Sequence, residues 1–234
     1  MRSLVAILAV ALTAAAAQAQ SPDRPIVVEL FTSQGCNSCP PADEFLRELS
    51  ARRDVLAIEL HVDYWDYIGW RDPFAQRHFT DRQRAYSRAM DQRYVYTPQM
   101  VIDGRYQEVG SDRGAVMRLI ERARNERGET LTIEAQPGTR ASVRVSGAVR
   151  GPAVVWAAVL DPSHETDVTR GENGGRRLVN TNTVRHMQRF GVYNGTPEDY
   201  PMIACEPHQA LAVVVQGGNG TGPIYAARLF APQR

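Results

Sequence analysis

Two cysteines separated by two residues are the feature of this sequence best suited to chemistry. Cys36 and Cys39 lie in Gly-Cys-Asn-Ser-Cys-Pro at 35–40, between an apolar run at 26–31 and a helix-like segment at 41–53. One turn at a helix start can bring two Cα atoms within the roughly 4.4–6.8 Å that a disulfide needs. The positive helix end also favours a thiolate. The spacing predicts a redox-active pair; a stabilising disulfide or half of a metal site are the alternatives.

The N-terminal residues have the features of a secretory signal peptide. Arg2 is followed by an apolar stretch at 4–17 and by Ala17-Gln18-Ala19, a small-x-small cleavage pattern. The apolar stretch is too short to span a membrane. We therefore expect a signal peptide at 1–19 and a periplasmic or secreted protein without a membrane span.

The charge balance argues against two classes of partner. The full chain has 27 basic and 26 acidic residues, and cleavage after Ala19 would remove Arg2 and make the two equal. A formal charge near zero argues against nucleic acid and anionic membranes as partners.

Export changes the interpretation of the cysteines, because an oxidising compartment favours paired thiols. The chain has three, Cys36, Cys39 and Cys205. Pairing Cys36 with Cys39 closes a very short loop and adds little chain-entropy stabilisation, so we expect the pair to serve chemistry. For Cys205 we favour a buried small apolar residue. Intermolecular pairing or reaction with the Cys36–Cys39 pair is the alternative.

The first half of the chain alternates between strand and helix patterns. A buried strand is expected at 54–62, one or two polar-faced helices at 73–93, and two strands at 99–109 joined at Asp103-Gly104. Ser111 can cap a further helix that reaches about residue 127. Strand–helix–strand, hairpin and helix is the order of a thioredoxin-like domain, here with a helical insertion, which we assign to residues 20–128.

After residue 128 the pattern is mostly β. Short strand-like runs are separated by Gly, Pro, Asn and Asp, which predicts a smaller, sandwich-like β domain at 129–234. Its glycine-rich segment at 170–177 lacks the spacing of a phosphate-binding loop, and we interpret it as an exposed hairpin loop.

Thr97-Pro98, directly before the strand at 99–102, can complete the site. Thioredoxin-like proteins place a cis-proline there, packed against the two cysteines, and the backbone of the preceding residue can then pair with a substrate peptide. The alternative is an ordinary proline at the start of a strand.

His61 and Asp63 end the second strand, at the edge of the sheet where Cys36 is expected. They are two residues apart and so point to one face. Either could move protons during thiol–disulfide exchange or tune the pKa of a thiol. The alternative is that both only order the loop at 61–67.

A metal site is the competing interpretation of the same side chains. Cys36, Cys39 and His61 are ligand types that copper(I) or zinc accepts. However, the chain has no second Cys-x-x-Cys and no His-x₃-His to close a tetrahedral site. We therefore predict no metal and no cofactor, and keep copper handling or non-catalytic binding as the alternative function.

The segments at 29–43, 61–66, 96–104 and 171–176 together resemble a family of exported bacterial proteins with a thioredoxin-like region, known as domain of unknown function 1223. The resemblance covers most of the mature chain. It implies a fold and a compartment, and says little about a reaction.

These observations predict an exported thiol–disulfide oxidoreductase that acts on protein thiols or disulfides. Cys36, facing solvent, would be the nucleophile, Cys39 would resolve the mixed disulfide, and Thr97-Pro98 would present backbone to the substrate. Pro40 should push Cys39 toward extended dihedrals. Acidic residues in the first helical turn, Asp43 and Glu44, should use its positive end. Both effects predict a pair that is reducing to intermediate.

Overall fold

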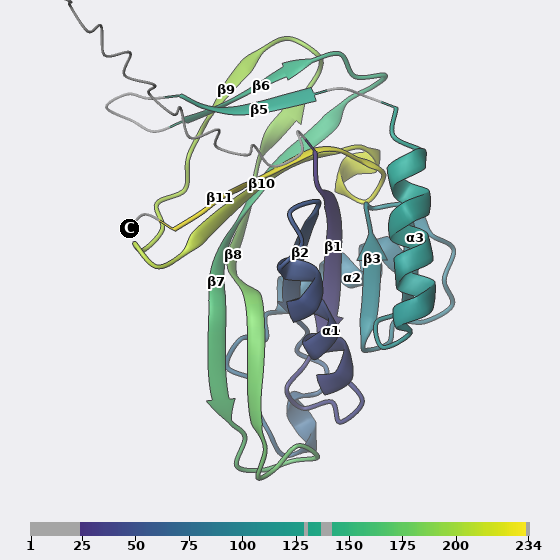
Figure 1. Ribbon diagram of the computed structural model, residues 1–234, viewed down its shortest axis with the longest axis vertical. Coiled ribbons are helices and arrows are strands. Elements are labelled where there is room, and N and C mark those ends of the chain that lie inside the picture. Colours follow the sequence, from purple (N-terminus) through teal and green to yellow (C-terminus); the bar gives the residue numbers. More distant parts are fainter. Residues whose placement is uncertain (1–23, 129–130, 137–141, 233–234) are drawn as a thin grey trace, which may run out of the picture.

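The computed structural model describes residues 24–128, 131–136 and 142–232. The signal peptide expected at 1–19 lies outside these residues. An eight-stranded mixed sheet is the largest element, and a three-stranded antiparallel sheet lies at one end of the molecule (Figure 1). None of the helices in the described ranges is long and apolar enough to cross a membrane.

Strands and helices alternate up to residue 125, and strands dominate after it. In chain order the elements are β1 (Ile26–Thr32), α1 (Pro40–Ser50), β2 (Val55–His61), η1 (Asp66–Ile68), α2 (Arg77–Ala89), β3 (Gln99–Ile102), β4 (Tyr106–Val109), α3 (Arg113–Asn125), β5 (Leu131–Gln136), β6 (Ser142–Gly147), β7 (Ala153–Asp167), β8 (Arg177–Tyr193), β9 (Glu198–Pro201), β10 (Ala210–Gln216), η2 (Gly218–Gly220) and β11 (Ile224–Phe230).

The first four strands form one side of the large sheet. β1 is parallel to β2 and antiparallel to β3, which pairs with β4. Every residue of β1 and β2 is buried, as expected of strands covered on both faces. The predicted strands at 26–31 and 54–62 are confirmed. The hairpin turn at Asp103-Gly104 is confirmed as well, and its two residues have φ of 51° and 64°.

Helices cover both faces of this part of the sheet. α1 and α3 pack on one face, in the apolar cluster that contains Ile120, and α2 packs on the other, in the cluster that contains Phe79. Helix α3 was expected to be capped by Ser111. Asp112 caps it instead, because its side chain accepts a backbone hydrogen bond from the first turn of α3.

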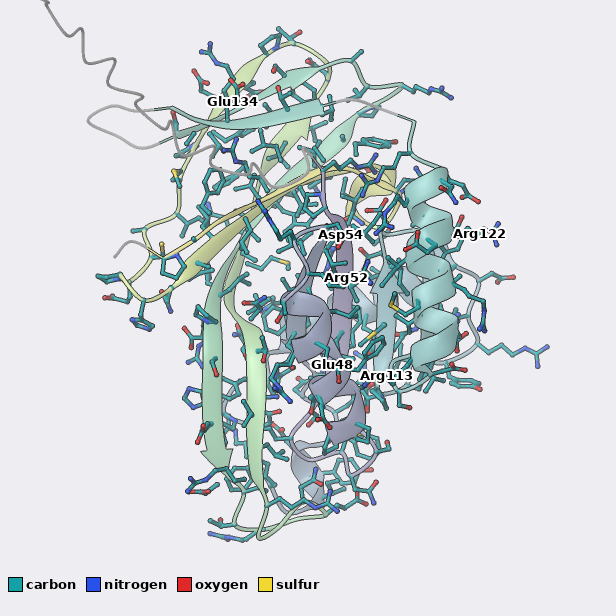
Figure 2. All side chains as sticks on the ribbon, in the orientation of Figure 1. Glu48, Arg52, Asp54, Arg113, Arg122 and Glu134 are labelled. Atoms are coloured by element: carbon teal, nitrogen blue, oxygen red, sulfur yellow. A yellow bond between two sulfur atoms is a disulfide. The ribbon has the colours of Figure 1, made fainter. Side chains whose placement is uncertain are left out.

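Ion pairs on the outer surface join α1 and α3. Glu48 of α1 pairs with Arg113 of α3, and Asp54 after α1 pairs with Arg52 and Arg124 (Figure 2). Exposed ion pairs contribute little to stability. The apolar cluster beneath α1 and α3 therefore holds them to the sheet.

The strands after residue 128 extend the same sheet. β8 pairs in parallel with β2 at Glu59↔Thr183, and β7, β10 and β11 follow in order. β7 and β8 have 15 and 17 residues and run side by side along the long axis of the molecule (Figure 1). The boundary predicted at 128/129 thus separates two regions that share one sheet.

The three-stranded sheet, in the order β5-β6-β9, packs against this second region. Ile133 and Val145 of the small sheet share an apolar cluster with Val155 and Val213 of the large one. Two sheets therefore enclose a core here, as expected of a sandwich-like arrangement.

Candidate functional site

Cys36 and Cys39 form a disulfide between the end of β1 and the start of α1, with their Cα atoms 5.5 Å apart. Cys39 is the N-cap of α1 and has helical dihedrals, φ −79° and ψ −38°. The expectation that Pro40 would push Cys39 toward extended dihedrals is wrong. Cys39 instead enters the first helical turn, where its carbonyl accepts from the amide of Ala42 at 2.8 Å. Because Pro40 and Pro41 have no amide hydrogen, the first N–H groups of α1 are those of Ala42 and Asp43, and both donate to the Cys39 carbonyl.

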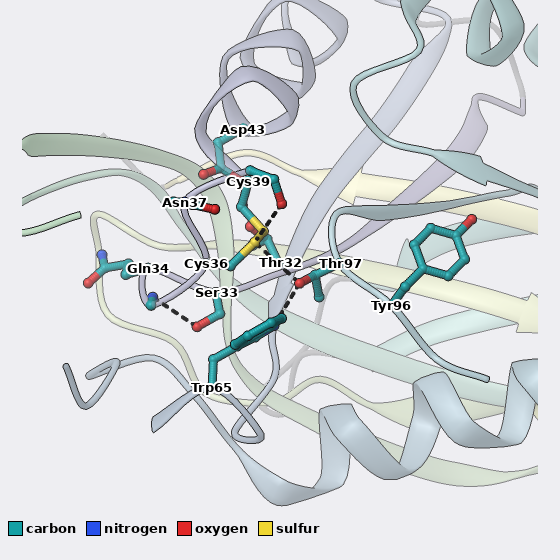
Figure 3. Close-up of a disulfide and its surroundings, with 12 residues drawn as sticks. Thr32, Ser33, Gln34, Cys36, Asn37, Cys39, Asp43, Trp65, Tyr96 and Thr97 are labelled. Atoms are coloured by element: carbon teal, nitrogen blue, oxygen red, sulfur yellow. Dashed lines mark hydrogen bonds between the residues drawn. A yellow bond between two sulfur atoms is a disulfide. The ribbon is translucent and has the colours of Figure 1, made fainter. Parts of the chain in front are cut away.

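Both cysteines are buried, since Cys36 is 2% exposed and Cys39 0%. The prediction that Cys36 faces solvent is therefore wrong. Neighbouring side chains cover its sulfur: the Thr97 hydroxyl donates to Cys36 Sγ at 3.3 Å, and Ser38 Oγ lies 3.3 Å from the same atom. Trp65 Nε1 in turn donates to Thr97 Oγ1 at 2.7 Å, which holds the indole beside the disulfide (Figure 3).

The Thr97-Pro98 peptide bond is cis, as predicted, and it lies against the disulfide. Thr97 contacts Cys36 through its side chain, a contact that the sequence did not suggest. Tyr96, the residue before Thr97, points away from the sulfurs (Figure 3), and its hydroxyl donates to Gln107 of β4.

Asp43, in the first turn of α1, is buried beside the pair. Its Oδ1 accepts from the Thr32 hydroxyl at 2.7 Å. Burial raises the pKa of Asp43 well above its usual value, and the nearby Glu59 adds to the rise. The buried carboxyl group therefore binds a proton more readily than an exposed aspartate does. This burial was not expected for a residue assigned to the positive end of the helix.

His61 lies behind the Cys36 turn in a buried ionic network. Its Nδ1 is 2.7 Å from Asp72 Oδ2, and its Nε2 is 3.5 Å from Glu59 Oε2. Burial alone would lower the pKa of His61, but Asp72 and Glu59 raise it to about 10. The same histidine lowers the pKa of Asp72 despite the opposing effect of burial. Because Asp72 Oδ2 also accepts from the Gln34 amide at 2.8 Å, His61 reaches the Cys36 turn through Asp72.

Asp63, predicted to act beside His61, is held by helix α2. Its Oδ1 accepts from the Thr80 hydroxyl at 2.6 Å, and its backbone amide donates to Thr80 Oγ1 at 3.1 Å. Asp63 therefore orders the loop after β2, which was the alternative interpretation of this residue.

The loop between β7 and β8 supplies site residues that the sequence analysis missed. Asn173 is 0% exposed, and its Nδ2 donates to the carbonyls of Gln34 and Cys36, each at 2.9 Å. Glu172 Oε2 accepts from the Asn37 amide at 3.3 Å. The segment at 170–177 was interpreted as an exposed loop because it is polar and glycine-rich. One signal could have revealed its role in the site: residues 171–176 are among the segments that carry the family resemblance.

The described residues contain no group of three or more His, Cys, Asp or Glu side chains that could hold a metal ion. His61, one of the three ligands considered, is engaged by Asp72 and Glu59. The remaining cysteine, Cys205, is exposed and unpaired, so the interpretation as a buried apolar residue is wrong.

Comparison with known proteins places the chain in a family. The profile of a family described as "Protein of unknown function (DUF1223)" matches residues 27–216, so the chain belongs to this family. Protein AGR_C_4864 from Agrobacterium tumefaciens is 31% identical, with a TM-score of 0.78 over 89% of this chain and 95% of that chain. HBP35 of Porphyromonas gingivalis shares the fold, with a TM-score of 0.57 at 12% identity over 89% of this chain and 75% of that chain. No curated protein matches the chain.

Proposed function

For this member of the DUF1223 family, we propose the function of an exported thiol–disulfide oxidoreductase, with residues 24–128 as its thioredoxin-like part. The observation that carries the proposal is the Cys36–Cys39 disulfide at the start of α1, with the Thr97 hydroxyl on Cys36 Sγ. A helix N-terminus and a hydroxyl donor both stabilise the negative charge that develops on sulfur during exchange. The signal-like N-terminus supports a periplasmic or secreted location.

The reaction is a two-step exchange that transfers two electrons. A substrate thiolate attacks Cys36 Sγ, the bond between the two cysteines breaks, and Cys39 leaves as a thiolate that takes up a proton. A second substrate thiolate then attacks the mixed disulfide at the substrate sulfur and releases the Cys36 thiolate. The substrate leaves as a disulfide and the protein as a dithiol; substrate reduction is the reverse.

Asp43 and His61 have separate roles in this proposal. Asp43 lies one helical turn after Cys39, and burial raises its pKa, so in this proposal its carboxyl group exchanges a proton with the Cys39 thiolate. His61 positions the turn before Cys36 through Asp72 and Gln34.

Two features support a polypeptide as the substrate. The partly buried Trp65 indole donates to Thr97, the residue whose hydroxyl contacts Cys36 Sγ, and so offers an apolar surface beside the pair. On the Tyr96 side of the same loop lies a pocket of ≈ 590 Å³, lined by Gln92, Arg93, Tyr94, Tyr96, Gln107 and Val109. A pocket of this size can hold a large side chain of a polypeptide that binds along this loop.

Trapping of mixed disulfides tests the proposal. Cys39→Ala cannot resolve an intermediate on Cys36, so it should accumulate thiol-cleavable adducts with other exported proteins. The experiment needs a Cys205→Ala background, because the exposed Cys205 thiol could form adducts of its own. The matched control adds Cys36→Ala and should trap nothing.

Equal adduct yields in the trapping variant and its control would refute the proposal. Absence of adducts, together with tight copper binding by the reduced wild-type protein, would favour the metal-handling alternative instead.

A further inference from the structure

The tip of the β7–β8 hairpin, residues 168–176, reaches the disulfide from the second half of the chain. β7 and β8 extend along the long axis of the molecule, and their connecting loop lies at one end of it (Figure 1). Asn173 and Glu172 of this loop contact Gln34, Cys36 and Asn37, as described above. The residues in contact are 135 to 139 positions apart in the sequence.

The hydrogen-bonding capacity of Asn173 is used at this contact. Its amide nitrogen serves the two carbonyls on either side of Gly35, and its amide oxygen accepts from Arg176 Nη1 at 3.0 Å. The loop itself is fixed, since the Gly175 amide donates to the Val168 carbonyl at 2.7 Å. The tip therefore holds Asn173 in the position from which it binds the two carbonyls of the Cys36 turn.

Close packing against the loop after β2 holds the tip in place. Gly171 has a φ of +73°, and a Cβ atom there would lie 3.1 Å from Trp70 Cβ. Gly69 has a φ of +103°, and a Cβ there would lie 3.4 Å from Gly171 Cα. Side chains at either position would strain the backbone or separate the tip from its partner loop.

Glu172 places an exposed acidic side chain against the backbone between the two cysteines. Its carboxylate accepts from the Asn37 amide, between the two cysteines, and so uses a donor that would otherwise favour a nearby anion. The other charged or titratable groups that face this turn have partners of their own. Asp72 and Glu59 flank a protonated His61, and Arg176 is bonded to Asn173. Asp43 is buried, which raises its pKa, and it accepts from the Thr32 hydroxyl.

We propose that the hairpin tip is an added part of the redox site, in which Asn173 positions the Cys36 turn and the Glu172 carboxylate lowers the fraction of Cys36 present as thiolate. A negative charge within several ångströms of a thiolate disfavours ionisation of the thiol. The inference deepens the proposed function, because it assigns control of the same cysteine pair to the second half of the chain.

Alkylation of the reduced protein tests the role of Glu172. In a Cys205→Ala background, the rate of reaction with iodoacetamide is measured from pH 5 to 10. Glu172→Gln keeps an acceptor oxygen for the Asn37 amide and removes the charge. We expect the midpoint of its pH profile to fall by about 0.5–1 unit, which is about three- to tenfold more thiolate below the midpoint.

The matched control is Glu165→Gln, which removes the same charge from the same hairpin. The Glu165 carboxylate is 63% exposed and faces Arg177, so its removal should leave the midpoint unchanged. An unchanged midpoint in Glu172→Gln, or an equal shift in both variants, would overturn the assignment.

Asn173→Ala tests the positioning role separately. Loss of both donors should free the Cys36 turn and raise the alkylation rate on the high-pH plateau, where all of the thiol is ionised. A lower Tm with an unchanged plateau rate would show that Asn173 serves stability alone.

These measurements need only a reducible pair and no substrate. A negative trapping experiment would therefore refute the proposed function and leave the effect of the hairpin tip on Cys36 intact.

Discussion

Alkaline pH should destabilise the protein through His61. The side chain is 1% exposed; burial alone would lower its pKa, but Asp72 and Glu59 raise it to about 10. A histidine in an unfolded chain titrates near 6.5, so folding favours the proton. This stabilisation is fully present below about pH 6.5 and is lost as the pH rises toward 10. At about 1.4 kcal/mol per pH unit, the loss between pH 6 and 9 reaches about 3 kcal/mol.

Urea denaturation of the oxidised Cys205→Ala protein at pH 6 and pH 9 measures this loss. His61→Asn offers an N–H to Asp72 in place of Nδ1–H but cannot carry the charge. Its free energy of unfolding should therefore change by about 3 kcal/mol less between the two pH values. His208→Asn removes a histidine that is 71% exposed and should behave as the parent protein. If His61→Asn kept the full pH dependence, the assignment of a protonated His61 would be refuted.

Three further substitutions test neighbouring parts of the structure. Asp43→Asn should raise the Tm at pH 7 in thermal denaturation, because burial disfavours the ionised carboxylate and a neutral amide has no ionised form; a lower Tm would contradict the raised pKa of Asp43. Trp65→Phe removes the hydrogen bond to Thr97 and should speed reduction of the disulfide by dithiothreitol at least about threefold, since one such bond contributes about 1 kcal/mol; an unchanged rate would show that the indole does not limit access. Arg82→Met leaves the buried Glu29 without its ion-pair partner and should lower the free energy of unfolding by about 3–5 kcal/mol. Because Arg82 also bonds β10 and the η2 turn, the two regions should unfold in a single transition. Two separate transitions, of which only one is affected, would indicate independent domains.

Local signals made the core of the site predictable. Two cysteines at a strand–helix junction, a proline before a strand and Asp-Gly between two strands each specify a conformation within a few residues. The disulfide, the cis bond at Thr97-Pro98 and the hairpin turn were accordingly predicted in the right places. The order of strands and helices up to residue 125 followed from periodicity for the same reason.

The features that the sequence could not reveal all depend on contacts between distant segments. The surroundings of the Cys36 sulfur include Thr97, which contacts it, and Trp65, which binds Thr97. The contact of Asn173 with the Cys36 carbonyl depends on the length of a hairpin that begins more than a hundred residues later. Asp43 was expected to be a charged helix-end residue, and only the packed structure shows that it is buried.

These corrections change the reasons for the expected redox poise. Cys39 has helical dihedrals and burial raises the pKa of Asp43, so both reasons taken from the sequence are weakened. Burial of Cys36 and the Glu172 carboxylate now oppose the thiolate instead. A less stable thiolate gives a less stable reduced form and hence a more reducing pair. Equilibration with a glutathione series should place the potential well below that of a strong oxidase, and a value near about −120 mV would show that the helix N-terminus outweighs both effects.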